Sequence, residues 1–161
     1  DTAKLGSNIS QDDLLWVRNQ VSSTMLPKQE QTNRIYVSRQ DTNRHVSNFG
    51  EIREILAQHG FEVYQLEDIP VSKQLNLFYT ADCIAGPHGA GLINSLFSHK
   101  KTTLIELLPN RDKIHPLGHY GHYFRMSELI NIDYEYVLSD KQTSPEFYID
   151  PVEFSSVLSN V

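Results

Sequence analysis

The sequence predicts an α/β fold, a Rossmann-like doubly wound parallel sheet in one lobe. Short apolar runs of strand length alternate along the chain with segments whose apolar residues recur at helical spacing. The stretch from Thr80 to Glu106 combines both patterns, because it is composed of a strand, a glycine-rich turn, a helix and a second strand. That order is the βαβ unit of parallel sheets. At 161 residues, 39% of them hydrophobic, the chain is long enough for one domain with a substantial core.

The predicted elements before the central unit follow from apolar spacing and from residues that begin or end helices. Ser10 suits a helix cap, Asn48 and Glu51 form a capping-box pair, and Gly60 ends the second helix. The predicted order is a helix over about 10–25, a strand over 35–38, a helix over 48–59, a strand over 61–66 and a helix over 71–82.

The central unit contributes a buried strand at 83–85, a helix after the turn and a second strand over 102–108. The sequence pattern is weaker beyond Pro109. A long loop over 110–121 precedes a helix over 123–130 and a strand over 134–137, and a short final helix begins at Asp150 or Pro151. We therefore expect one lobe over 1–161, with a lead-in over 1–33, a motif-bearing core over 34–109, and loop and C-terminal elements over 110–161.

Charge and cysteine content exclude several classes of protein. The net charge of −6 disfavours a nucleic-acid or anionic-membrane surface over the whole domain. A local basic segment exists, because four arginines lie between Asn33 and Arg53 against only Asp41 and Glu51. The single cysteine, Cys83, supports no internal disulfide, and its apolar neighbours predict a buried, inert thiol. No apolar run approaches membrane-spanning length.

The turn Gly86-Pro87-His88-Gly89-Ala90-Gly91 has a chemical use. The first peptide N–H groups of a helix carry partial positive charge and receive phosphate, and glycines allow a ligand to approach the backbone closely. GPHGAG is neither GxGxxG nor a P-loop, so a purely structural helix start is the alternative.

Three features fall at the carboxyl ends of predicted strands, where open parallel sheets bind their ligands. Arg39 and Arg44 follow the first strand, the His88 turn follows the third, and Glu106 lies near the end of the fourth. Cations, peptide N–H groups and a carboxylate on one edge suit a nucleoside diphosphate and its sugar hydroxyls. Separately, the arginines could be solvated loop charges and His88 could hydrogen-bond the backbone. A Glu106 buried within an apolar run needs a partner unless it reaches the strand end.

The succession Arg39…Arg44…Asn48, then GPHGAGLINSLF and TLIELLP, resembles glycosyltransferase family 61 over about 34–109. That family includes plant β-1,2-xylosyltransferases, the EGF-domain O-linked N-acetylglucosamine transferase and many bacterial enzymes of polysaccharide biosynthesis. The resemblance implies an inverting transferase of GT-B architecture, with two Rossmann-like lobes. It also implies that the carboxyl-terminal lobe binds a nucleotide-sugar donor, commonly a UDP-sugar, without a catalytic metal or other cofactor.

The resemblance also assigns roles to residues of this chain. By motif, Arg39 and Arg44 face the diphosphate, and Glu106 holds the ribose. The remaining implied donor-site residues belong to the turn and its helix: His88, Gly89, Ala90, Gly91 and Asn94. The acceptor is expected to be a hydroxyl of a glycan or protein, and no catalytic residue is identified.

A two-lobed transferase has a further lobe ahead of this one, whereas little more than one helix precedes the first predicted strand. The chain lacks an initiator Met, and we expect it to be a piece of a longer, active transferase. We expect the isolated chain to bind donor weakly and to turn over poorly, because an inverting transfer needs a base for the acceptor hydroxyl. The bacterial cytoplasm is the favoured compartment, with the Golgi or ER lumen if the source is eukaryotic.

Other functions have less support in the sequence. His115, His119 and His122 have zinc-ligand spacing, but Pro116 and neighbouring glycines favour a substrate-side loop there. No GxSxG elbow supports a hydrolase, and SRQDTNR after the first strand disfavours an NAD-type dehydrogenase. The remaining alternative is a non-catalytic nucleotide-binding or interaction module with the same fold.

Overall fold

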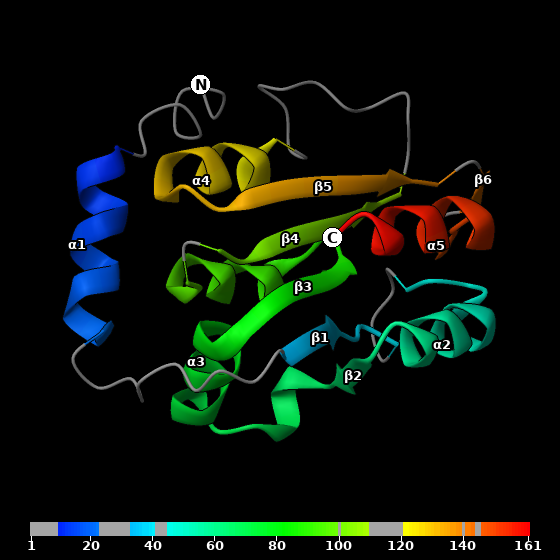
Figure 1. Cartoon of the computed structure of the whole chain (residues 1–161), viewed down its shortest axis with the longest axis horizontal. Coiled ribbons are helices and arrows are strands. Elements are labelled where there is room, and N and C mark those ends of the chain that lie inside the picture. Colours follow the sequence, from blue (N-terminus) through cyan, green and yellow to red (C-terminus); the bar gives the residue numbers. More distant parts are fainter. Residues whose placement is uncertain are drawn as a thin grey trace.

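The computed structural model describes residues 10–22, 33–40, 45–99, 101–109, 121–139, 141–143 and 146–161. Its centre is a parallel five-stranded sheet in the order β2-β1-β3-β4-β5 (Figure 1). The strands are β1 (Asn33–Val37), β2 (Phe61–Tyr64), β3 (Ala81–Pro87), β4 (Thr103–Leu108) and β5 (Asp133–Leu138). The predicted Rossmann-like α/β class is confirmed, and every predicted strand is present.

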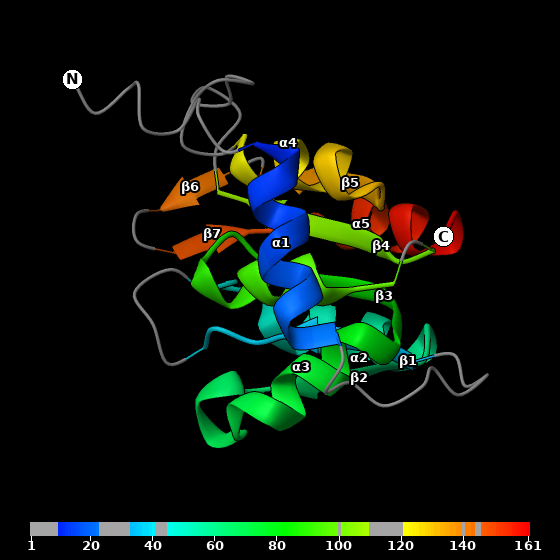
Figure 2. The same ribbon diagram turned by 90° about the vertical axis from the view of Figure 1, so that its left-hand side faces the viewer.

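Helices cover both faces of the sheet, as a doubly wound fold requires. On one face lie α2 (Phe49–Gln58) and α5 (Pro151–Ser159). On the other lie α3 (Val71–Thr80), the 3-10 helix η3 (Ala90–Phe97) and α4 (His122–Ile130). The first helix, α1 (Gln11–Ser22), contacts α4 and η3 and lies in front of them in Figure 2.

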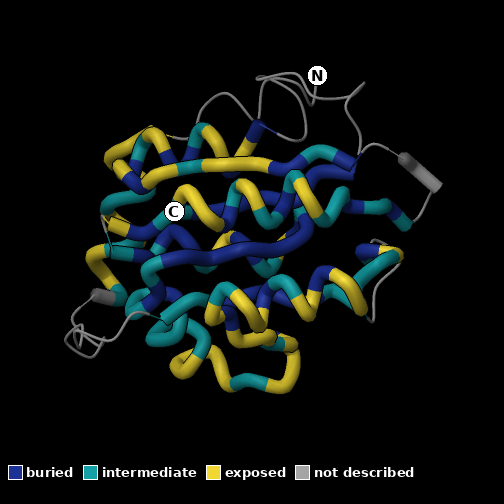
Figure 3. Tube along the Cα trace, turned by 45° about the vertical axis from the view of Figure 1, so that its right-hand side comes forward, coloured by how far each residue is buried: buried dark blue, intermediate teal, exposed yellow. Residues whose placement is uncertain are grey.

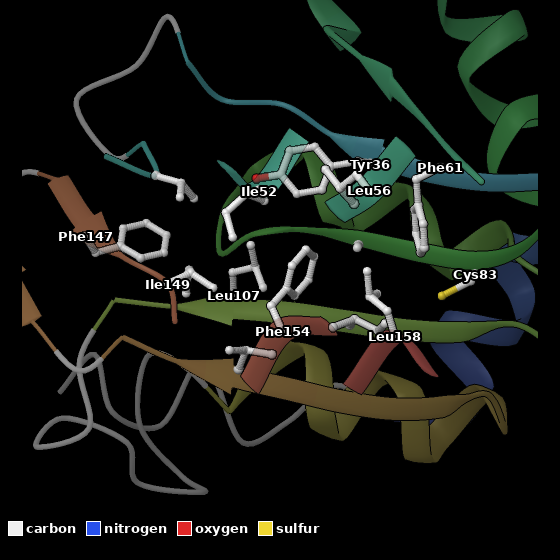
Figure 4. Packing of buried hydrophobic residues seen from close by; sticks show 14 residues of the cluster. Tyr36, Ile52, Leu56, Phe61, Cys83, Leu107, Phe147, Ile149, Phe154 and Leu158 are labelled. Atoms are coloured by element: carbon white, nitrogen blue, oxygen red, sulfur yellow. The ribbon is translucent and has the colours of Figure 1, made fainter. Parts of the chain in front are cut away.

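The face covered by α2 and α5 carries a continuous apolar core, which we call the α2/α5 core. Side chains from all five strands point into it because alternate residues of a strand face opposite sides. Phe154 and Leu158 of α5 meet Leu107 of β4 and Tyr36 of β1 between sheet and helix (Figure 4). Cys83 lies in the same core, and burial raises the pKa of its thiol to about 12, as expected for an inert cysteine.

The opposite face holds the second core, which we call the α3/α4 core. Leu104 of β4 points into it together with Phe78 of α3, Leu92 of η3 and Met126 of α4. The central strands are buried on both sides, whereas the helices keep exposed stripes (Figure 3). Glu106 follows Leu104 by two residues and therefore points into this second core, which places a carboxylate among apolar side chains.

The strand order determines where a ligand site is expected. The chain leaves β1 to the outer strand β2 and then returns across β1 to β3, so the order reverses between β1 and β3. Open α/β sheets bind ligands at such a switch point, beyond the carboxyl ends of the strands. Here those ends lead into Ser38-Arg39 and His88-Gly89, the two segments that the sequence singled out.

Several local predictions need correction. The Asn48 and Glu51 side chains are paired, with Asn48 Nδ2 donating to Glu51 Oε2 at 3.2 Å, but Asn48 makes no capping bond to the α2 backbone. Its amide nitrogen also donates to Ile149 O at 2.8 Å, and its amide oxygen accepts from Ile149 N at 3.1 Å. The helix after the glycine turn is a 3-10 helix, in which Leu92 N donates to Gly89 O. The second strand ends at Tyr64 and is followed by a 3-10 turn, η2 (Leu66–Asp68).

Between β5 and the final helix, the structure has a pair of strands that the sequence did not predict. A two-stranded antiparallel pair, β6 (Lys141–Thr143) and β7 (Glu146–Tyr148), lies between β5 and α5. The predicted start of the final helix is confirmed: α5 begins at Pro151, and the Asp150 carboxylate caps it by accepting from the N–H groups of Val152 and Glu153. Within the described residues, no helix combines the length and apolar character needed to cross a bilayer.

Candidate functional site

The turn after β3 is fixed by its backbone before any side chain is considered. His88 N donates to Leu107 O at 2.9 Å, which extends the β3–β4 ladder by one residue past the strand. Leu92 N donates to Gly89 O at 3.1 Å as the first bond of η3. The N–H groups of Ala90 and Gly91 precede that bond, so they lie at the positive end of the helix.

Arg39 lies directly over this turn. Its guanidinium Nη1 is 3.5 Å from His88 O, at the switch point between β1 and β3. A Cβ atom built on Gly89 would fall 1.2 Å from the same Nη1 atom. Gly89 is extended, with a φ of 166°, so its backbone would accept another residue, and an added Cβ would conflict with the flexible end of the Arg39 side chain. The position of Arg39 therefore depends on the missing side chain at Gly89.

Glu106 is buried completely and is paired on both sides. One carboxylate oxygen, Oε1, contacts Nδ1 of His88, and the other accepts from the Tyr134 hydroxyl at 2.6 Å. Among the buried residues that the structure describes, Glu106 is the one charged side chain. Burial and the neighbouring Glu106 carboxylate both raise the pKa of Tyr134, so this phenol stays protonated and able to donate.

Tyr123 connects helix α4 to the turn. Its hydroxyl donates to Gly89 O at 2.6 Å, and its ring meets the His88 ring edge-on, with centroids 5.6 Å apart. Burial, with a smaller contribution from the Glu106 charge, raises the pKa of Tyr123 to about 12. The His88 ring is thus held by Glu106, which contacts its Nδ1 atom, and by Tyr123, which packs against the ring.

A cavity of about 360 Å³ opens beside the turn, within the size range of small-molecule sites. Its walls come from the turn and from the three helices α1, η3 and α4. The lining is apolar at Leu14, Ile93 and Met126. Two α4 residues add a polar imidazole, His122, and a cationic guanidinium, Arg125. His88, Gly89 and Ala90 form the wall that the cavity shares with the sheet edge.

The structure brings together most of the residues that the sequence proposed. Arg39, His88, Gly89 and Glu106 are joined by direct contacts, and Ala90 lines the cavity. The convergence at one sheet edge is therefore present. Glu106 lies within β4 rather than at its end, and its carboxylate contacts protein groups, so its predicted ribose contact stays a prediction.

Of the other proposed residues, Gly91 and Asn94 have packing or linking contacts within the protein. A Cβ on Gly91 would lie 3.0 Å from Val37 Cγ1, so this glycine allows η3 to pack closely against β1. The Asn94 amide donates to Gln74 Oε1 at 2.9 Å and links η3 to α3. Arg44 is outside the described residues.

The described residues give no support to the alternative of a zinc site. Of the three spaced histidines, His115 and His119 lie outside the described residues, and His122 begins α4. The described part of the chain contains no group of three or more His, Cys, Asp or Glu side chains arranged to hold a metal ion.

Sequence reasoning did not find Tyr134 or Arg125, and it placed Tyr123 at the start of a predicted helix. Tyr134 and Tyr136 alternate along a predicted strand, so a shared face could be anticipated from period two. Which of them reaches Glu106 depends on strand register. Tyr136 is directly opposite Glu106, but Tyr134, two residues earlier and opposite Leu104, makes the hydrogen bond.

The sequence matches a known protein family over most of these elements. A family model described as glycosyltransferase 61 matches residues 2–105, which include β1, Arg39, the His88 turn and η3. A search of curated proteins found no sequence that matches the chain. The family match covers more than half of the chain and contains the residues that meet at the switch point. This chain belongs to glycosyltransferase family 61.

Proposed function

We propose that this chain is the donor-binding domain of an inverting glycosyltransferase of GT-B architecture that uses a UDP-sugar. The observation that supports this proposal best is the contact of Arg39 with the His88-Gly89 turn at the β1/β3 switch point. Membership of the family supports transfer of a sugar from a donor to an acceptor. The GT-B arrangement, the inverting outcome and the uridine base are parts of the proposal.

Charge complementarity determines where the diphosphate would lie. The Arg39 guanidinium contacts the carbonyl of His88, two residues before η3 begins, and a guanidinium binds phosphate oxygens in a bidentate manner. The guanidinium and the first N–H groups of η3 would stabilise the negative charge that develops on the leaving diphosphate, without a metal. The cavity beside the turn would receive the part of the donor attached to the diphosphate.

In an inverting transfer, an acceptor hydroxyl attacks the anomeric carbon while the bond from that carbon to the diphosphate oxygen breaks. A base takes the hydroxyl proton, and UDP leaves with the bonding electron pair. On this proposal a second lobe supplies the acceptor site and the base, and the described chain supplies the donor site. The isolated chain is then expected to bind UDP with little turnover.

Isothermal titration of the chain with UDP, in EDTA, tests the proposal. Arg39→Ala should weaken UDP binding by about 10- to 100-fold, the range expected for a charge-assisted hydrogen bond. Gly89→Ala should have a similar effect, because the added Cβ displaces the guanidinium. The double variant should bind as Arg39→Ala does, since both changes remove the same contact.

Arg53→Ala is the matched control, because Arg53 is an exposed arginine on α2, away from the turn. Its affinity for UDP should equal that of the wild type. Titration with ADP and GDP establishes whether the base is discriminated. If the wild type binds none of these nucleotides, the non-catalytic interaction module becomes the better interpretation and the donor-site proposal fails.

A further inference from the structure

We propose that Glu106 and Tyr134 are positioning residues that hold the His88 imidazole with its proton on Nδ1, so that Nε2 is the ring atom offered to the donor. Only the part of this inference that concerns the donor rests on the proposed function; the position of the His88 proton does not. The inference concerns a hydrogen-bonded chain that runs from β5 through β4 to the turn after β3. The family match ends at residue 105 and does not include Glu106 or Tyr134.

The first step of the argument is burial. The Glu106 side chain is 0% exposed, and that of His88 is 14% exposed. A buried carboxylate is costly unless its oxygens accept hydrogen bonds, so Glu106 needs donors on both sides. Burial and the Glu106 charge raise the pKa of Tyr134, so its hydroxyl stays protonated and donates to Oε2. The group at Oε1 must then also donate, which places a proton on Nδ1 of His88.

The second step is the restriction of the ring. The His88 main chain is held by Leu107 O at its nitrogen and by Arg39 at its carbonyl. The Tyr123 ring packs edge-on against the imidazole. With Nδ1 directed at Glu106, Nε2 lies on the opposite side of the ring, and His88 is one of the residues that line the cavity. A carboxylate that fixes the tautomer and orientation of an imidazole is a recurrent arrangement in enzymes.

The role at the donor follows from this geometry. The diphosphate is proposed to bind next to His88 with the ring doubly protonated in the complex, so that Nδ1–H stays on Glu106 while Nε2–H donates a hydrogen bond to a phosphate oxygen. No covalent bond forms between His88 and the donor. Glu106 on this account does not contact the ribose, because both of its oxygens are engaged within the protein.

The test uses nitrogen NMR of the ¹⁵N-histidine-labelled chain without ligand, which reports the proton on each imidazole nitrogen. In the wild type, the neutral His88 ring should be the Nδ1–H tautomer. The double variant Glu106→Leu/Tyr134→Phe removes carboxylate and hydroxyl together, so no buried polar group of this pair is left without a partner. His88 should then lose its preference for Nδ1–H. Urea unfolding of the same sample verifies that the variant is folded.

Tyr136→Phe is the matched control, because Tyr136 is directly opposite Glu106 on β5 but half exposed. It should leave the His88 tautomer unchanged. A wild-type ring with its proton on Nε2 only, or an Nδ1–H tautomer that persists in the double variant, would overturn the inference.

Titration with UDP separates this inference from the proposed function. If positioning matters for the donor, Glu106→Leu/Tyr134→Phe and His88→Gln should lose affinity by the same factor, about 10- to 100-fold for one hydrogen bond to a charged group. An affinity kept by the double variant but lost by His88→Gln contradicts the donor role. If the wild type binds no UDP, the proposed function fails, and the tautomer result alone decides whether Glu106 positions His88.

Discussion

The two faces of the sheet are built from the same strands but differ in chemistry. Strand residues that point toward α2 and α5, such as Ile105 and Leu107 of β4, are apolar and fully buried. On the opposite face the same strand presents Glu106. Its partner His88 directly follows β3, and its partner Tyr134 lies on β5. One face is an apolar core, and the other combines a core with a hydrogen-bonded network.

This difference separates stability from function along a single strand. The α2/α5 core gains free energy from buried apolar area, which is largely indifferent to small rotations of side chains. The network around Glu106 depends on direction, because hydrogen bonds weaken steeply with misalignment. Substitutions in the α2/α5 core should therefore change stability first, and substitutions in the network should change ligand binding first.

Phe154→Ala provides the largest expected effect. Phe154 is 0% exposed between α5 and the sheet, and its truncation should lower the free energy of unfolding by about 3–5 kcal/mol. Urea unfolding measures the loss. UDP affinity, titrated at a temperature where the variant is folded, should stay within about twofold of wild type. A loss as large as that of Arg39→Ala would show that the two faces are coupled.

Tyr134→Phe should have an intermediate effect. It removes the 2.6 Å hydrogen bond to Glu106 Oε2 and leaves a buried carboxylate with one fewer donor. The expected loss is about 1–3 kcal/mol in the free energy of unfolding. Tyr136→Phe, the exposed neighbour on the same strand, should change it by less than about 0.5 kcal/mol. Equal effects of the two changes would mean that the network contributes nothing beyond burial.

Tyr123→Phe should have the smallest effect on stability at neutral pH, and its clearest sign is a changed pH dependence above pH 10. The pKa of Tyr123 is raised to about 12 by burial and by Glu106, against about 10 in the unfolded chain. The neutral phenol is thus favoured in the folded state, so its contribution is complete below pH 10 and is lost as pH rises toward 12. The slope in that window is about 1.4 kcal/mol per pH unit for one proton.

In Tyr123→Phe the stability should fall less steeply between pH 10 and 12, as measured by urea unfolding at several pH values. Tyr36 and Tyr134 also have raised pKa values, mainly through burial, so part of the decline should remain. An unchanged slope would indicate that Tyr123 titrates alike in the folded and unfolded chain.

The predictions from sequence succeeded where one residue type has one physical meaning. Gly60 ends α2 with a positive φ of 74°, α5 begins at Pro151, and Cys83 is buried within an apolar strand. Asn48 shows the limit, because its amide could serve either the helix start or a distant backbone. The amide instead hydrogen-bonds the backbone of Ile149, about a hundred positions along the chain, whose C=O accepts from it and whose N–H donates to it.

The candidate site divides in the same way. Arg39, His88 and Glu106 were found because cations, a glycine turn and a carboxylate follow strands, and parallel strands bring their carboxyl ends to one edge. Tyr134 and Arg125 were not found, since nothing in their local sequence distinguishes them from surface tyrosines and arginines. Their roles come from the register of β5 and from the placement of α4.

The sequence by itself determined the alternation of strands and helices, and with it the parallel sheet and the edge where polar residues gather. It did so because hydrophobic periodicity and turn residues act over a few neighbouring positions. The tertiary structure decided the partners of Glu106, the position of Arg39 over Gly89 and the walls of the cavity. These depend on strand order, register and helix packing, which bring together side chains far apart in the chain.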